Sequence, residues 1–161
     1  SAEVVGDSVE EMLEMADDYI EIGPNITIKV PLTPEGLKVC KDLSTDDVAV
    51  NVTLCFSTAQ AILAAKAGAT YVSPFVGRVN DQSFDGIKLI EEISDVYATH
   101  KQKTQVLAAS IRDVHQVASC FRVGADICTI PSKIFSGMYK HILTDQGLKK
   151  FDEDWSKLVG G

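Results

Sequence analysis

One lysine of this chain has a setting that suits covalent chemistry. Lys29 lies between Ile28 and Val30, two residues before Pro31, and lysine is rarely buried without a reason. Desolvation and nearby cations would lower its pKa and leave part of the population as the free amine, which attacks carbonyl carbons. The alternative is a lysine whose stem crosses a strand end and whose ammonium reaches solvent or pairs with Glu3. The pattern alone leaves both hypotheses open.

Two of the three arginines follow strand-like runs and suit a phosphate group. Arg78 comes after a run that ends near Ser73, and Arg112 comes directly after Ser110. Guanidinium forks bind phosphate oxygens bidentately, and serine hydroxyls add donors. A surface ion pair is the alternative for either arginine, although finding both after strand ends favours a shared site. Together with Lys29 they predict a Schiff-base enzyme that acts on a phosphorylated carbonyl compound.

Further polar residues lie near the ends of the first and third strand-like runs. Glu3 and Thr53 could hold a water that shuttles a proton, although a solvated surface carboxylate is the alternative for Glu3. Asn51 and Thr53 share one face of their strand because successive side chains of a strand alternate. If the opposite, apolar face meets helices, this polar face lines the interior of a barrel.

Strand-like runs and amphipathic helical stretches must alternate along the chain to position these residues. Strands are expected at 2–5, 26–30, 48–54, 71–73, 105–109 and 127–130. Helices are expected at 8–22, 34–43, 58–67, 113–123, 132–140 and 145–158, with a further long helix that ends near 100 after a loop at 74–84. Strands rich in Val and Ile that are separated by helices indicate a parallel sheet covered by helices.

Two α/β architectures have such a sheet, the doubly wound open sheet and the (β/α)8 TIM barrel. The phosphate-loop patterns GxGxxG and GxxxxGK are absent from the sequence. Polar residues at the ends of many successive strands are typical of the TIM barrel, whose site is built there. We therefore predict a TIM-barrel fold in a single domain over residues 1–161.

Composition excludes several classes of partner. The net charge of −8 argues against nucleic acid, and no apolar run approaches the roughly 18 residues of a membrane span. The cysteines form no CxxC pair and none has metal-ligand spacing from a histidine, so we expect no metal site. Buried thiols in a reducing cytoplasm are the expectation for all four, Cys40, Cys55, Cys120 and Cys128.

Five segments of the chain resemble the transaldolase family, and in particular its small, fructose-6-phosphate aldolase-like subfamily. They are IKVPLTPEGL at 28–37, NVTLCFS at 51–57, AGATYVSPFVGR at 67–78, AASIR at 108–112 and LTDQGL at 143–148. The segments occur in the family's order and span nearly the whole chain. The chain is thereby identified as a member of this family.

The resemblance implies a transaldolase of the pentose phosphate pathway that needs no cofactor. Lys29 would form an imine with a ketose and keep a dihydroxyacetone unit as an enamine, which then adds to an aldose phosphate. Sedoheptulose 7-phosphate and glyceraldehyde 3-phosphate would exchange with erythrose 4-phosphate and fructose 6-phosphate. The implied roles are a catalytic water at Glu3 and Thr53, substrate hydrogen bonds from Asn51 and Ser73, and phosphate binding by Arg78, Ser110 and Arg112.

Two other hypotheses remain open. Fructose 6-phosphate aldolases of the same family release free dihydroxyacetone, but they carry Gln where this chain has Glu3 and Tyr where it has Phe75, so the resemblance favours transfer. A non-catalytic partial barrel is the third hypothesis, because the family's first two βα units, with a catalytic Asp and an Asn, match no part of the chain.

Residue 3 corresponds to the family's third strand, so barrel strands 3–8 are expected here. About 55 further residues would complete the barrel, judging from the length of a βα repeat, and we expect little activity without them. The resemblance also implies a homo-oligomer, a ring-type pentamer or decamer joined near Phe151 and Trp155 in the helix at 145–158.

Overall fold

The computed structural model of the chain describes residues 1–160. The chain divides into two compact units, Ser1–Ile130 and Pro131–Gly161. The single domain expected over residues 1–161 stays a prediction, and each unit has its own elements.

The first unit is built on six parallel strands, as the alternation of the sequence predicts. Their bounds are β1 Ala2–Glu3, β2 Ile28–Pro31, β3 Val50–Cys55, β4 Tyr71–Pro74, β5 Gln105–Ala108 and β6 Ile127–Cys128. Every predicted strand is present, most of them shorter than expected. The edge strands β1 and β6 keep only two residues each.

Six helices connect or follow these strands: α1 Val9–Ile20, α2 Pro34–Thr45, α3 Thr58–Lys66, α4 Val76–Asp81, α5 Gly86–Thr99 and α6 Val114–Arg122. Five of them begin at a side chain that accepts a hydrogen bond from the first helical turn, as polar N-caps do. These caps are Ser8, Thr33, Ser57, Asp85 and Asp113. The expected loop at 74–84 is wrong in part, because it contains α4.

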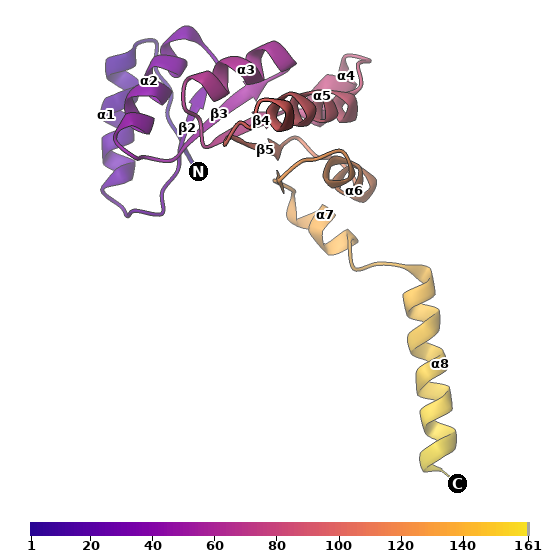
Figure 1. Ribbon diagram of the computed structural model, residues 1–161. Helices are drawn as coiled ribbons and strands as arrows, with labels where there is room; N and C mark the ends of the chain where they lie inside the picture. Colours follow the sequence, from indigo (N-terminus) through magenta and orange to yellow (C-terminus); the bar gives the residue numbers. More distant parts are fainter. Residues whose placement is uncertain (161) are drawn as a thin grey trace. The chain divides into compact units, whose positions relative to one another are not determined.

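Strand order separates the two candidate architectures. The strands hydrogen-bond in the order β1-β2-β3-β4-β5-β6, all parallel. Right-handed crossovers that always step in the same direction place every helix on one face of the sheet. The contacts between helices follow the order of the strands, since α1 contacts α2, α2 contacts α3, α3 contacts α5 and α5 contacts α6 (Figure 1). A doubly wound sheet would reverse direction midway. The unit is therefore a six-stranded arc of the predicted TIM barrel.

A continuous apolar layer joins the sheet to its helices. The strands contribute Ile28, Val30, Val50, Val52 and Val72, and the helices contribute Met12, Ala16, Val39, Ile90 and Ile93, all buried. Burial of each Val, Ile or Met side chain among them contributes roughly 1.5–3 kcal/mol. The strands that carry the polar residues are therefore held in place by this apolar layer.

The second unit consists of α7 Ser132–Gly137 and α8 Ile142–Val159. The helix expected at 145–158 is present and longer, whereas the one expected at 132–140 ends earlier. None of the residues of α8 is buried. Within residues 1–160, no helix combines the length and apolar character that crossing a membrane requires.

Candidate active site

Lys29 lies in a row of polar side chains that crosses the first three strands. Parallel pairing aligns Glu3 with Lys29 and Lys29 with Asn51, so the three side chains emerge on the same face. The Nζ of Lys29 lies 3.0 Å from the Oε2 of Glu3. The ion pair with Glu3, the alternative that the sequence leaves open for Lys29, is therefore present, and it places the Lys29 nitrogen beside a carboxylate that can take up a proton.

The polar side chains on the next two strands, β3 and β4, are buried. Asn51, Thr53 and Ser73 are 3%, 0% and 2% exposed. The hydroxyl of Ser73 donates to the Oδ1 of Asn51 at 2.7 Å. Among residues 1–160, the buried Oγ1 of Thr53 makes no hydrogen bond to another protein group, so it is available to a water or a ligand.

A β-bulge interrupts the ladder beside these residues. The register between β3 and β4 shifts between Val52 and Cys55, and Leu54 has a φ of 60°, which is unusual for a residue other than glycine. Bulges next to active sites re-aim side chains, and strained backbone persists where the surroundings enforce it. Phe75 directly follows β4, and after the shift its N–H donates to the carbonyl of Cys55 at 3.1 Å.

The residues expected to bind phosphate come from two adjacent connections. The first turn of α4 is tied to the segment after β5, because the N–H of Val76 donates to the carbonyl of Ala109 and that of Gly77 to the carbonyl of Ser110, both at 3.0 Å. Ser110 itself has a φ of 58°. Arg78 on α4 is thereby held next to the loop that carries Ser110.

An aromatic pair supports Arg78. The guanidinium carbon of Arg78 lies 4.9 Å from the centre of the Phe75 ring, within the range of a cation–π contact. The edge of Phe56 meets Phe75 with 5.7 Å between ring centres. The sequence drew attention to Phe75 but missed Phe56, since a contact between β3–α3 and β4–α4 connections has no local signal.

Arg112 has a partner that the sequence also missed. Its Nη1 and Nη2 donate to Oδ1 and Oδ2 of Asp81 at 3.1 and 2.5 Å. The surface ion pair considered for the arginines is thus present at Arg112. No local signal points to this pair, because Arg112 lies on another βα connection, 31 residues away.

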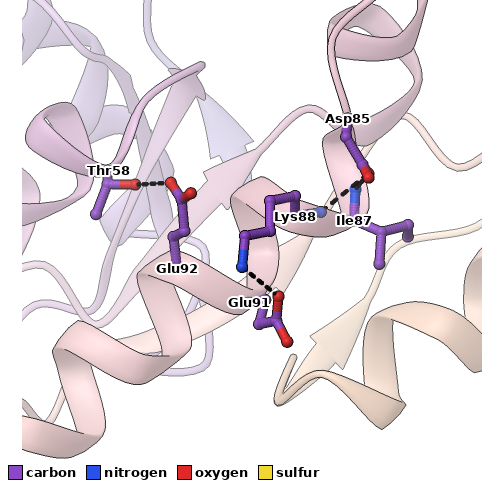
Figure 2. Close-up of polar contacts among 6 residues, drawn as sticks. All are labelled: Thr58, Asp85, Ile87, Lys88, Glu91 and Glu92. Atoms are coloured by element: carbon purple, nitrogen blue, oxygen red, sulfur yellow. Dashed lines mark hydrogen bonds and ion pairs between the residues drawn. The ribbon is translucent and has the colours of Figure 1, made fainter.

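Both arginines line a groove of about 1000 Å³ between the start of α3 and helices α4 and α5. The other charged residues on its wall include Asp81, Lys88 and Glu92. Figure 2 shows how the α5 side of the groove is ordered: Glu92 accepts from the hydroxyl of Thr58 at 3.1 Å, and Lys88 pairs with Glu91 at 2.8 Å. Asp85 caps α5 through the N–H groups of Ile87 and Lys88.

The cysteines lie apart from this chemistry. Burial raises the pKa of Cys40 to about 11 and that of Cys55 to about 12, so both are neutral thiols near pH 7. Cys120 is buried and Cys128 half-buried. Over residues 1–160 the structure contains no cluster of three or more His, Cys, Asp or Glu side chains that could hold a metal ion.

The model of one protein family, transaldolase/fructose-6-phosphate aldolase, matches residues 1–161. The chain belongs to this family. Proteins named "Probable transaldolase" from Paracoccus denitrificans and from Cereibacter sphaeroides (strain ATCC 17025) are 52% and 54% identical to it over 157 residues. The match covers 98% of this chain and 72% of each relative. The resemblance seen in the sequence is confirmed.

Solved structures agree on the fold of this transaldolase-family chain. A structure of a mandelate oxidase variant matches it with a TM-score of 0.62 over 80% of the chain, at 15% identity. The chain spans about half of that protein, 48% of its length. At this identity the likeness concerns the fold alone, and it supports the α/β barrel architecture.

Proposed function

We propose that the chain is the part of a transaldolase that carries its Schiff-base lysine, Lys29. The observation that carries the proposal is the aligned row of Glu3, Lys29 and Asn51, with the Lys29 nitrogen 3.0 Å from Glu3. Lys29 lies between two buried strand residues, and the carboxylate of Glu3 is placed to accept the proton that the ammonium must lose before the amine attacks a ketose carbonyl.

The proposed reaction transfers a three-carbon unit from one sugar phosphate to another through the Lys29 amine. The Lys29 amine adds to C2 of sedoheptulose 7-phosphate and loses water, which gives an imine. Cleavage of the C3–C4 bond moves its electron pair into the imine, leaves an enamine on Lys29 and releases erythrose 4-phosphate. The enamine carbon then attacks the aldehyde of glyceraldehyde 3-phosphate, and hydrolysis of the new imine releases fructose 6-phosphate. Glu3 and the unpartnered Oγ1 of Thr53 are suited to hold the water that moves these protons.

The phosphate group would bind at Arg78, Ser110 and Arg112. The backbone hydrogen bonds from α4 to Ala109 and Ser110 support this assignment, because they hold the two contributing connections together. Binding of the remote phosphate fixes the position of the reacting carbonyl, which is how binding energy lowers the barrier of a distant step.

Transfer is favoured over release of free dihydroxyacetone. Phe75 stands where the aldolases of the family carry Tyr, and its ring is enclosed by Phe56 and Arg78. An apolar ring beside the enamine helps to exclude water. Accumulation of free dihydroxyacetone in the absence of an acceptor aldehyde would instead identify an aldolase.

Trapping the imine tests the nucleophile. The experiment uses the chain joined at its N-terminus to the two βα units of a relative, because the match covers 72% of the relatives' length. Borohydride with fructose 6-phosphate should fix a three-carbon adduct on Lys29, identified by peptide mass spectrometry. Lys38 and Lys66 lie on exposed helix positions and are the internal controls, and an adduct on either in place of Lys29 would refute the assignment.

The same joined protein tests whether the barrel must be complete. The resemblance places the family's acid/base Asp on βα units of the relatives that match no part of this chain, and general acid–base catalysis typically contributes about 10²–10⁴-fold. We expect the 161-residue chain alone to show little transaldolase activity and the joined protein to recover it with a cooperative thermal transition. Full activity of the shorter chain, verified by mass, would contradict the role given to that Asp.

Self-association through α8 completes the proposal. Leu148, Phe151, Trp155 and Leu158 are exposed at spacings of three and four residues, which gives one apolar stripe along the helix. A second copy of the chain is the proposed partner. Light scattering of the joined protein should show a homo-oligomer that Phe151→Ser with Trp155→Ser dissociates, and an unchanged mass would exclude α8 as the interface.

A further inference from the structure

The end of the Arg112 guanidinium that is formed by its two terminal nitrogens is already bound in this structure. Both terminal nitrogens donate to the two carboxylate oxygens of Asp81, at 3.1 and 2.5 Å. This parallel pair of hydrogen bonds is the geometry with which arginine binds the oxygens of a phosphate. Asp81 therefore occupies the edge of Arg112 that a phosphate would take.

The other side of the Arg112 side chain is covered by α4. A Cβ at Gly77 would lie 2.8 Å from the Nε and 2.9 Å from the Cγ of Arg112, so the stem packs flat against the helix at this glycine. The stem is thus fixed while the terminal nitrogens face Asp81. A phosphate that engages both nitrogens must displace the carboxylate.

We propose that Asp81 is an internal competitor for Arg112 and that binding of a phosphorylated sugar exchanges this carboxylate for the phosphate. The proposal rests on the phosphate site proposed above and adds a residue to it. Asp81 and Arg112 are about half exposed, at 48% and 53%, so the pair can open without unfolding the helix. Asp81 ends α4, where a change of side-chain direction disturbs no further turn.

The exchange would set how tightly product is held. A phosphate that binds Arg112 must first break the ion pair with Asp81, and the ion pair forms again when the phosphate leaves. Asp81 therefore weakens phosphate binding and favours release. Release of product often limits turnover. Asp81 is then a residue that tunes affinity for phosphorylated ligands without contacting the reacting carbons.

Titration of the joined protein with inorganic phosphate tests the exchange, and Arg78, Asp81, Ser110 and Arg112 all come from Ser1–Ile130 of this chain. The Kd is measured by calorimetry, and the Nε–H resonance of Arg112 is followed by NMR. Asp81→Asn should lower the Kd by about two- to fivefold, the range that corresponds to losing an exposed ion pair. The Nε–H resonance should move on phosphate binding in the unchanged chain and start nearer its bound position in the variant.

Glu92→Gln is the matched control, since it removes the same charge from the same groove while its carboxylate contacts Thr58. It should leave the Kd nearly unchanged. In an Arg112→Ala background, Asp81→Asn should no longer tighten binding, because its effect acts through Arg112.

An unchanged or raised Kd for Asp81→Asn would overturn the exchange and identify Asp81 as a support for Arg112. If Glu92→Gln lowered the Kd equally, or if Asp81→Asn still lowered it without Arg112, the change would come from net charge alone. Either result would also overturn the exchange. Binding that is insensitive to both Arg78→Ala and Arg112→Ala, or no binding at all, would refute the phosphate site itself.

Discussion

The hydroxyl of Ser73 donates a 2.7 Å hydrogen bond to the Oδ1 of Asn51, across the parallel strands β4 and β3. Because both side chains are buried, this bond fixes the orientation of the amide. The Nδ2 of Asn51 is then the group left to donate, and its partner at 3.4 Å is the hydroxyl of Ser1. Asn51 therefore directs its Nδ2 donor toward Ser1, the residue that precedes β1.

Removal of the Ser73 hydroxyl should weaken binding of the ketose. Ser73→Ala lets the Asn51 amide rotate and leaves its buried Oδ1 unpaired, which costs roughly 1–3 kcal/mol. We expect KM for fructose 6-phosphate to rise several-fold in steady-state kinetics of the joined protein. Ser44→Ala is the control, since that hydroxyl bonds only to the Lys41 and Ala67 carbonyls, and an equal change in both variants would show a general loss of stability.

Phe75→Tyr should shift the enzyme from transfer toward release. The added hydroxyl can position or supply a proton next to the enamine, whereas the phenyl ring excludes water. The ratio of free dihydroxyacetone to transferred product, measured with fructose 6-phosphate and an acceptor aldehyde, should increase. Phe121→Tyr adds the same hydroxyl at an exposed site on α6 and should leave the ratio as it was. If the two variants behave alike, Phe75 has only a packing role.

Phe56→Leu should affect phosphate-bearing substrates through Phe75 and Arg78. It removes the edge-to-face contact with Phe75, and aromatic pairs of this kind contribute about 0.5–1.5 kcal/mol. We expect KM for glyceraldehyde 3-phosphate to rise about two- to tenfold, with kcat and the melting temperature nearly unchanged because Phe56 is 41% exposed. A matched assay with unphosphorylated glyceraldehyde should show no rise, and a rise there would exclude an effect through Arg78.

The buried thiol of Cys55 should make stability fall at alkaline pH. Burial raises its pKa in the folded chain to about 12, from an ordinary value of 9.0. Above pH 9 the unfolded chain loses this proton first, so the stabilisation present below pH 9 declines as pH approaches 12, by about 1.4 kcal/mol at pH 10. Urea unfolding at pH 7 and pH 10 measures the loss, which should be smaller in Cys55→Ala. Equal losses in both proteins would show that Cys55 does not contribute.

The sequence predicts the alternation of strands and helices because each element carries its own periodicity, and most helices also carry a polar N-cap. It could not predict α4, whose six residues contain Gly77 and whose first turn is tied to Ala109 and Ser110. These bonds depend on a segment more than thirty positions away. Asp81 and Phe56 were missed for the same reason, since each acts on a partner from another βα connection.

The two-residue length of β6 limits what can pair with it. A strand edge exposes N–H and C=O groups that can recruit another strand, and a short edge forms few ladder bonds. Stable pairing at β6 therefore requires that the added strand also packs its side chains against the sheet.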